Sequence, residues 1–105
     1  GMVASASTQR LLVPLHIEGL QTTARVGQLY IEAQGQGIAS LRVQLFDLRG
    51  RLMIDQTRTG HALTIPLVTD TGKGLANGVY LYSVTVHGLD GRVMQTEIQK
   101  IVVLR

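Results

Sequence analysis

The side chains best suited to chemistry in this sequence are three histidines and seven carboxylates, and both sets are dispersed. His16, His61 and His87 fall on different predicted strands or strand starts, and none has a second histidine or a carboxylate at a metal-ligand spacing. The carboxylates lie mainly in predicted turns or on polar strand faces, without a paired motif: Glu18, Glu32, Asp47, Asp55, Asp70, Asp90 and Glu97. Solvent-facing positions explain both sets better than a metal centre or an acid–base pair. We therefore predict no catalytic residue, no metal site and no cofactor.

One glycine-rich stretch, Asp70-Thr71-Gly72-Lys73-Gly74, superficially resembles a phosphate-binding loop. A true phosphate loop needs Ser or Thr after its lysine and a helix N-terminus to hold the phosphate. Lys73 is instead followed by Gly74 and then by a predicted strand. Asp70 alone also falls short of the oxygen-rich ligand set that calcium requires. No serine lies in a nucleophile-elbow motif, so the sequence predicts a protein that is not an enzyme.

Composition and charge exclude several further classes. A chain of 105 residues makes one domain, and the absence of cysteine rules out disulfides and thiolate metal sites. The net charge of +3 comes from cations spread singly between Arg10 and Arg105, with Arg49, Arg51 and Arg58 as the only loose group. That spread indicates solvated strands and turns rather than a nucleic-acid interface. No apolar run is long enough to span a membrane.

The elements expected to position these residues are β-strands. Val79–His87 and Arg92–Leu104 are two long segments rich in β-branched residues, and the glycine-bounded turn 88–91 joins them as a hairpin. Before them, short strands are predicted at Leu11–Ile17 (interrupted by Pro14), Arg25–Ala33, Leu41–Leu48, Arg51–Gln56 and Ala62–Leu67, with Gly19–Thr23 and Val68–Leu75 as loops.

About seven strands with turns between them predict an all-β protein, an antiparallel β-sandwich of immunoglobulin-like type. In that scheme Val79–His87 is the F strand and Arg92–Leu104 the G strand. Tyr80 or Tyr82 is then expected to donate its hydroxyl to nearby backbone, as corner tyrosines of such sandwiches do. We place the sandwich at residues 10–105. Residues 1–9 are expected to be a disordered leader or linker end, with Gly1 left by tag cleavage and no signal peptide in Met2–Thr8.

From Leu41 onward the order of features carries a resemblance. An alternating strand leads to the basic glycine turn Arg49-Gly50-Arg51, followed by Asn77-Gly78-Val79-Tyr80, the glycine-bounded hairpin, and the basic, apolar ending Lys100–Arg105. This order resembles the C-terminal sorting domains of type IX secretion cargo. It is also similar to the immunoglobulin-like domain of the flagellar hook-capping protein.

The resemblance implies a non-catalytic module at the C-terminus of an exported or cell-surface protein, acting in sorting, anchoring or as a structural accessory. Its implied partners are export machinery or neighbouring protein domains, and its implied location is extracellular. The implied recognition tail consists of Lys100, Ile101, Val102, Val103, Leu104 and Arg105. Gly50, Asn77, Gly78 and Tyr80 are its structural motif, and each has a purely structural explanation in turn geometry or core filling.

Two other functions stay open. A carbohydrate-binding module would need exposed aromatic rings as stacking platforms, and only Tyr30, Phe46, Tyr80 and Tyr82 could supply them. An assembly module would pair an edge strand with a neighbour, giving a weak homo-oligomer.

Overall fold

The computed structural model describes residues 13–104 of the chain. The predicted leader, the start of the predicted domain at residue 10 and the last tail residue, Arg105, lie outside this range. The described part contains eight strands and no helix, so no helix there could span a membrane. The strands are β1 (His16–Arg25), β2 (Gln28–Gln36), β3 (Ile38–Phe46), β4 (Leu52–Thr59), β5 (Ala62–Pro66), β6 (Gly78–Gly88), β7 (Val93–Gln95) and β8 (Gln99–Val103).

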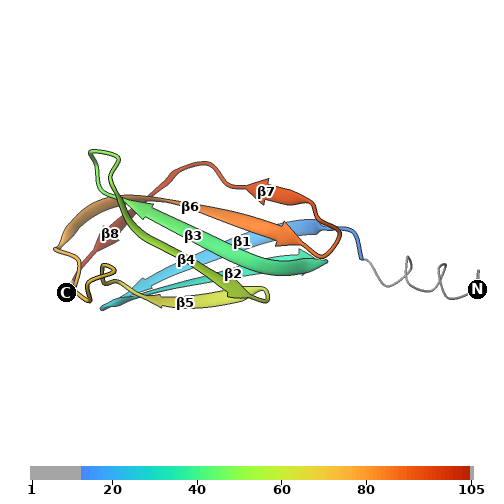
Figure 1. Ribbon diagram of the computed structural model, residues 1–105, viewed down its shortest axis with the longest axis horizontal. Coiled ribbons are helices and arrows are strands. Elements are labelled where there is room, and N and C mark those ends of the chain that lie inside the picture. The colour runs from blue at the N-terminus through green and yellow to red at the C-terminus, as the bar shows by residue number, and fades with distance from the viewer. Residues whose placement is uncertain (1–12, 105) are drawn as a thin grey trace, which may run out of the picture.

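The strands form two antiparallel sheets that face each other as a sandwich (Figure 1). One sheet has the order β1-β2-β5; the other has the order β4-β3-β6, with β7 and β8 both paired to the free side of β6. The predicted all-β, immunoglobulin-like sandwich is confirmed.

The core lies between the sheets and is almost entirely aliphatic. Alternate residues of β3 and β6 point inward, as the period-2 pattern predicts, so that Leu41, Val43 and Leu45 of β3 are fully buried. The central pair β3–β6 therefore fixes the sandwich, and the other strands extend it on either side.

Two predicted boundaries were wrong at the N-terminal hairpin. The segment Gly19–Thr23, expected to be a loop, lies inside β1, and the chain turns instead at Gly27, whose φ is 75°. Gly19 is accommodated inside β1 by a shift in the pairing register with β2 between Ile17 and Gly19. Consequently β2 starts three residues later than predicted, at Gln28.

The predicted G strand is divided in two, which raises the count from about seven to eight. Thr96 sits between β7 and β8, where its backbone N–H donates to the Val84 carbonyl (2.9 Å) and its hydroxyl accepts from the Val84 N–H (3.0 Å). Because the side chain takes the place of a ladder carbonyl, regular pairing stops at this residue. The fourth strand also differs, running to Thr59 rather than Gln56.

Candidate recognition surface

The predicted recognition tail is an edge strand with two distinct faces. In β8, Ile101 and Val103 point into the core and are 7% and 3% exposed. Lys100, Val102 and Leu104 lie on the opposite side and are exposed. The inward residues therefore hold the tail on the sandwich while the outward ones face solvent.

The start of β6 lies directly beside this tail. Gly78, Val79 and Tyr80 pair with Val103, Val102 and Ile101, in that order. The Tyr80 hydroxyl donates to the Ala76 carbonyl at 2.7 Å, four residues upstream, which is the backbone bond predicted for one of the two tyrosines. This bond ties the connection before β6 to the core, as in the tyrosine corner of immunoglobulin-like domains.

The turn between β3 and β4 is built around Asp47. Its carboxylate accepts from the backbone N–H groups of Arg49 and Arg51 (both 2.9 Å) and from the Arg51 Nε (2.7 Å). The Arg51 N–H is the main cause of a lowered Asp47 pKa, with the Arg51 guanidinium and the Arg49 N–H adding to it. Gly50 has φ of 85°, in the left-handed region that favours glycine, so the residue predicted for this turn is suited to it.

These three features lie at one end of the sandwich, where Figure 1 shows the β1–β2 turn near the end of β8 and the β3–β4 turn at the same end, higher in the view. Arg49, Arg51 and Asn77–Tyr80 border one shallow hollow of about 320 Å³, and Arg25, Val26, Val102 and Leu104 border another of about 260 Å³. The Val79–Val102 pair connects the two hollows.

We call this end the tail-end surface. Its apolar members are Val26, Leu48, Leu52, Val79, Val102 and Leu104, and its cationic members are Arg25, Arg49, Arg51, Lys73 and Lys100; all are exposed. Of these, sequence reasoning missed Val26 and Leu48 as surface features. The signal that could have found them is an aliphatic residue placed beside an arginine in a glycine turn.

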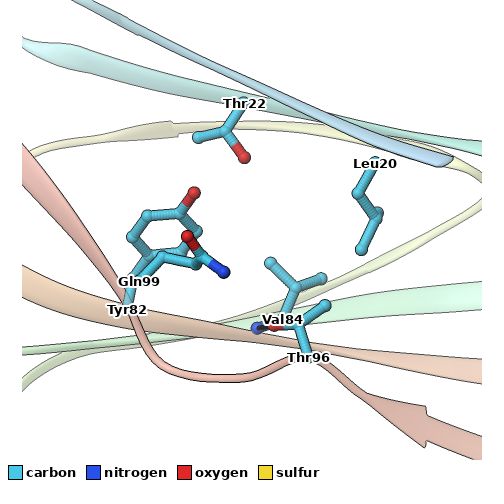
Figure 2. Close-up of a pocket in the computed structure, with 6 residues that line it drawn as sticks. All are labelled: Leu20, Thr22, Tyr82, Val84, Thr96 and Gln99. Carbon is cyan, nitrogen blue, oxygen red and sulfur yellow. Dashed lines mark hydrogen bonds between the residues drawn. The ribbon is translucent and has the colours of Figure 1, made fainter.

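A separate hollow opens between the sheets beside the interruption of the G strand (Figure 2). It measures about 270 Å³ and is lined by Leu20, Thr22, Tyr82, Val84, Thr96 and Gln99. The polar ends of Thr22, Tyr82 and Gln99 point into it, and within residues 13–104 the Tyr82 hydroxyl has no hydrogen-bond partner. This hollow is smaller than most small-molecule sites and no charged residue lines it.

The remaining candidate residues are dispersed. His16 and His61 are exposed, His87 is half-buried, and no group of three potential metal ligands occurs in the described part of the chain. Asp55 forms an ion pair with Arg42 on the outer face of the β4-β3-β6 sheet. The Arg42 hydrogen bond is the main cause of the lowered Asp55 pKa. Asp70 and Lys73 lie on an exposed turn between β5 and β6.

The four aromatic residues do not form a stacking platform. Tyr80 and Tyr82 are each 8% exposed, with their rings in the core. Tyr30 and Phe46 are only half-buried, but they lie on β2 and β3, which belong to different sheets. No two exposed rings share a face, which is what carbohydrate stacking would have required.

Comparison with known proteins identifies relatives of the fold only. No family model and no curated protein sequence matches the chain. Among solved structures, the dimeric latent PorU of Porphyromonas gingivalis matches 81% of this chain with a TM-score of 0.65 and 17% identity. CopC of Methylosinus trichosporium OB3b matches 83% of the chain with a TM-score of 0.58 and 17% identity.

PorZ, a surface component of the type IX secretion system of Porphyromonas gingivalis, matches 84% with a TM-score of 0.53 and 18% identity. The chain spans 9% of PorU and 12% of PorZ, but 90% of CopC. It therefore has a fold that occurs both as a small part of large proteins and as nearly a whole chain. At these identities the likeness carries no function with it.

Proposed function

We propose that this chain is a non-catalytic β-sandwich module at the C-terminus of an exported or cell-surface protein, and that export machinery reads it through the outward residues of β8. The observation that carries the proposal is that buried and exposed side chains alternate along the tail. Ile101 and Val103 hold β8 on the core, so that Val102 is presented beside Val79 and Lys100 beside Leu81, with the exposed Leu104 directly after the strand. A partner can then bind these side chains without the loss of conformational entropy that ordering a flexible segment would require.

Two further observations support this proposal. The fold also occurs in part of PorZ, a type IX surface component, so it is compatible with a place in an exported protein. In addition, the resemblance residues Gly50, Asn77, Gly78 and Tyr80, although separated in sequence, belong to elements that meet at the tail-end surface.

The test is a fusion of the whole chain to the C-terminus of a periplasm-directed reporter in the source organism. The whole chain is needed because β1 begins at His16 and belongs to the sandwich. Removing the tail would be a poor test, since loss of Ile101 and Val103 would open the core. We compare instead the outward double variant Lys100→Glu/Val102→Asp with Arg92→Glu/Val93→Asp, which introduces the same two acidic residues, with the same change in net charge, at exposed positions of the opposite end.

We expect the unmodified fusion and the Arg92→Glu/Val93→Asp fusion to reach the surface or medium, and the Lys100→Glu/Val102→Asp fusion to stay in the periplasm as folded protein. If all three fusions are retained, the module is not a sorting signal. If all three are exported, sorting does not depend on the outward tail.

The alternative functions have less support. Carbohydrate binding lacks exposed stacking rings. Edge-strand assembly is disfavoured because each edge carries a feature that natural sheets use to avoid pairing. β1 and β4 have register shifts, β5 is five residues long and ends at Pro66, and β7 and β8 are separated at Thr96. Analytical ultracentrifugation over a wide concentration range tests this second alternative, and a concentration-dependent dimer would revive it.

A further inference from the structure

The exposed apolar side chains are unevenly distributed over the molecule. Of the ten large hydrophobic residues that are exposed within residues 13–104, six belong to the tail-end surface. The two at turn tips stand out: Val26, between β1 and β2, is 77% exposed, and Leu48, between β3 and β4, is 64% exposed. Single exposed aliphatic residues are ordinary, but a group that spans two hollows and two turns marks an interaction surface.

Charged side chains are also unevenly distributed between the two ends of the sandwich. The tail-end surface has five lysines and arginines, and the carboxylates at that end are Asp47 and Asp70. Asp47 is already engaged by Arg51 and by turn N–H groups. At the opposite end the charges balance, with the arginines Arg58 and Arg92 against the carboxylates Glu18 and Asp90. The molecule is therefore cationic at the end where it is also most apolar.

The arrangement within the surface indicates what kind of partner covers it. Val26 follows Arg25, and Leu48 precedes Arg49, so each turn tip presents an aliphatic side chain directly beside a guanidinium. Peripheral membrane proteins combine these two features, since apolar groups enter the headgroup boundary while cations meet acidic headgroups. A protein interface would instead favour a buried apolar centre with a polar rim, often with aromatic anchors, and none of the members of the tail-end surface is aromatic.

We propose that the tail-end surface docks on an anionic lipid surface, with Val26 and Leu48 entering the headgroup layer and the four cations other than the Asp47-paired Arg51 facing acidic headgroups. The inference does not depend on a role in export, because the binding concerns the folded domain alone. Export and membrane docking can therefore fail separately.

The experiment is flotation of the purified 105-residue chain with phosphatidylcholine vesicles, with or without about 30% phosphatidylglycerol, at low salt and at about 1 M salt. The test variants are Val26→Asp and Leu48→Asp. The controls are Leu89→Asp and Val93→Asp, which make the same change in residues at the opposite end that are 53% and 59% exposed. A further variant, Arg49→Gln, removes one cation that no side-chain ion pair engages in the described structure. Thermal unfolding verifies that every variant is folded.

We expect binding to phosphatidylglycerol vesicles that is lost at high salt and absent on phosphatidylcholine alone. Val26→Asp and Leu48→Asp should each lower the partition coefficient more than tenfold, since each removes an apolar contact and adds a repelled charge. Arg49→Gln should lower it about fivefold, the equivalent of about 1 kcal/mol for one cation at an anionic surface.

Failure to float with anionic vesicles at low salt would overturn the proposal and leave an acidic protein surface as the partner for this end. Equal losses in the two control variants would also overturn it, because binding would then reflect overall charge and not this surface.

Discussion

Replacing Tyr80 with phenylalanine should destabilise the domain, while the same change at Tyr82 should not. Both rings are buried to the same extent, at 8% exposure, and they lie two residues apart on the inner face of β6. The two tyrosines differ in what their hydroxyl groups contact. That of Tyr80 donates to the Ala76 carbonyl at 2.7 Å, whereas that of Tyr82 points into the hollow beside Thr22 without a hydrogen-bond partner among the described residues.

The size of the effect follows from the environment of this bond. A net intramolecular hydrogen bond contributes about 1 kcal/mol, and leaving a buried acceptor unsatisfied costs a further 1–3 kcal/mol. Ala76 is exposed, so water can hydrate its carbonyl once the hydroxyl is gone. We therefore expect Tyr80→Phe to lower the free energy of unfolding by about 1 kcal/mol, or roughly 4–8 °C in Tm for a domain of this size. Tyr82→Phe should change it by less than about 0.5 kcal/mol.

Urea unfolding of the three proteins measures the difference, and the slope of the free energy against denaturant must stay constant for the comparison to hold. Equal destabilisation by the two substitutions would refute the reasoning, because the cost would then come from repacking of the rings. A neutral Tyr80→Phe would mean that the corner bond does not hold the connection before β6 in place.

Three shorter predictions concern the tail, a turn and acid stability. Ile101→Ala should cost about 2–5 kcal/mol because it opens a cavity in the core, whereas Val102→Ala, on the outer face of the same strand, should cost less than about 0.5 kcal/mol; urea unfolding distinguishes them. Gly50→Ala should cost about 1 kcal/mol by the same assay, because φ of 85° strains an L-residue although no atom lies within 4 Å of the added Cβ. The pKa of Asp90 is lowered, first by the Arg92 N–H and then by the Leu15 N–H, so its contribution to stability is present above the ordinary aspartate pKa and is lost as the pH falls from there towards the folded pKa. Asp90→Asn should flatten this acid dependence in unfolding curves recorded between about pH 6 and pH 2.

The part of the fold that the sequence predicted is the part where side-chain alternation is strong. β3 alternates buried and half-buried residues along most of its length, and β6 has the β-branched and aromatic residues that strands favour. The turn at Gly50 was predicted because a glycine between two strands provides the positive φ that a tight connection needs.

The failures occurred where local pattern and tertiary pairing disagree. No residue of β1 is fully buried, so its stretch Gly19–Thr23 lacks the alternation that identifies a strand, and its pairing with β2 determines its structure. The division of the G strand depends on one hydroxyl, because Thr96 bonds Val84 with both its side chain and its backbone. Threonine is common in strands, so its presence in the sequence does not indicate that its side chain will interrupt the hydrogen-bond ladder.

The candidate surface also could not be predicted from local sequence patterns, because it is formed by residues that are distant in the chain. The tail was selected by resemblance, but the turns that lie beside it in space are 50 to 80 residues away in the chain. Only the register of β8 on β6 places Val102 next to Val79, and only the sandwich places Val26 at the same end.

In this arrangement different residues of the tail serve the stability of the fold and the surface available to a partner. Ile101 and Val103 are tied to the core and cannot change without loss of stability, whereas Lys100, Val102 and Leu104 contribute little to packing. Their identity is therefore not required by the fold, and replacing the exposed valine or leucine with a polar residue should change the free energy of unfolding little. The apolar character of this outer face is better explained by something that binds there than by the sandwich itself.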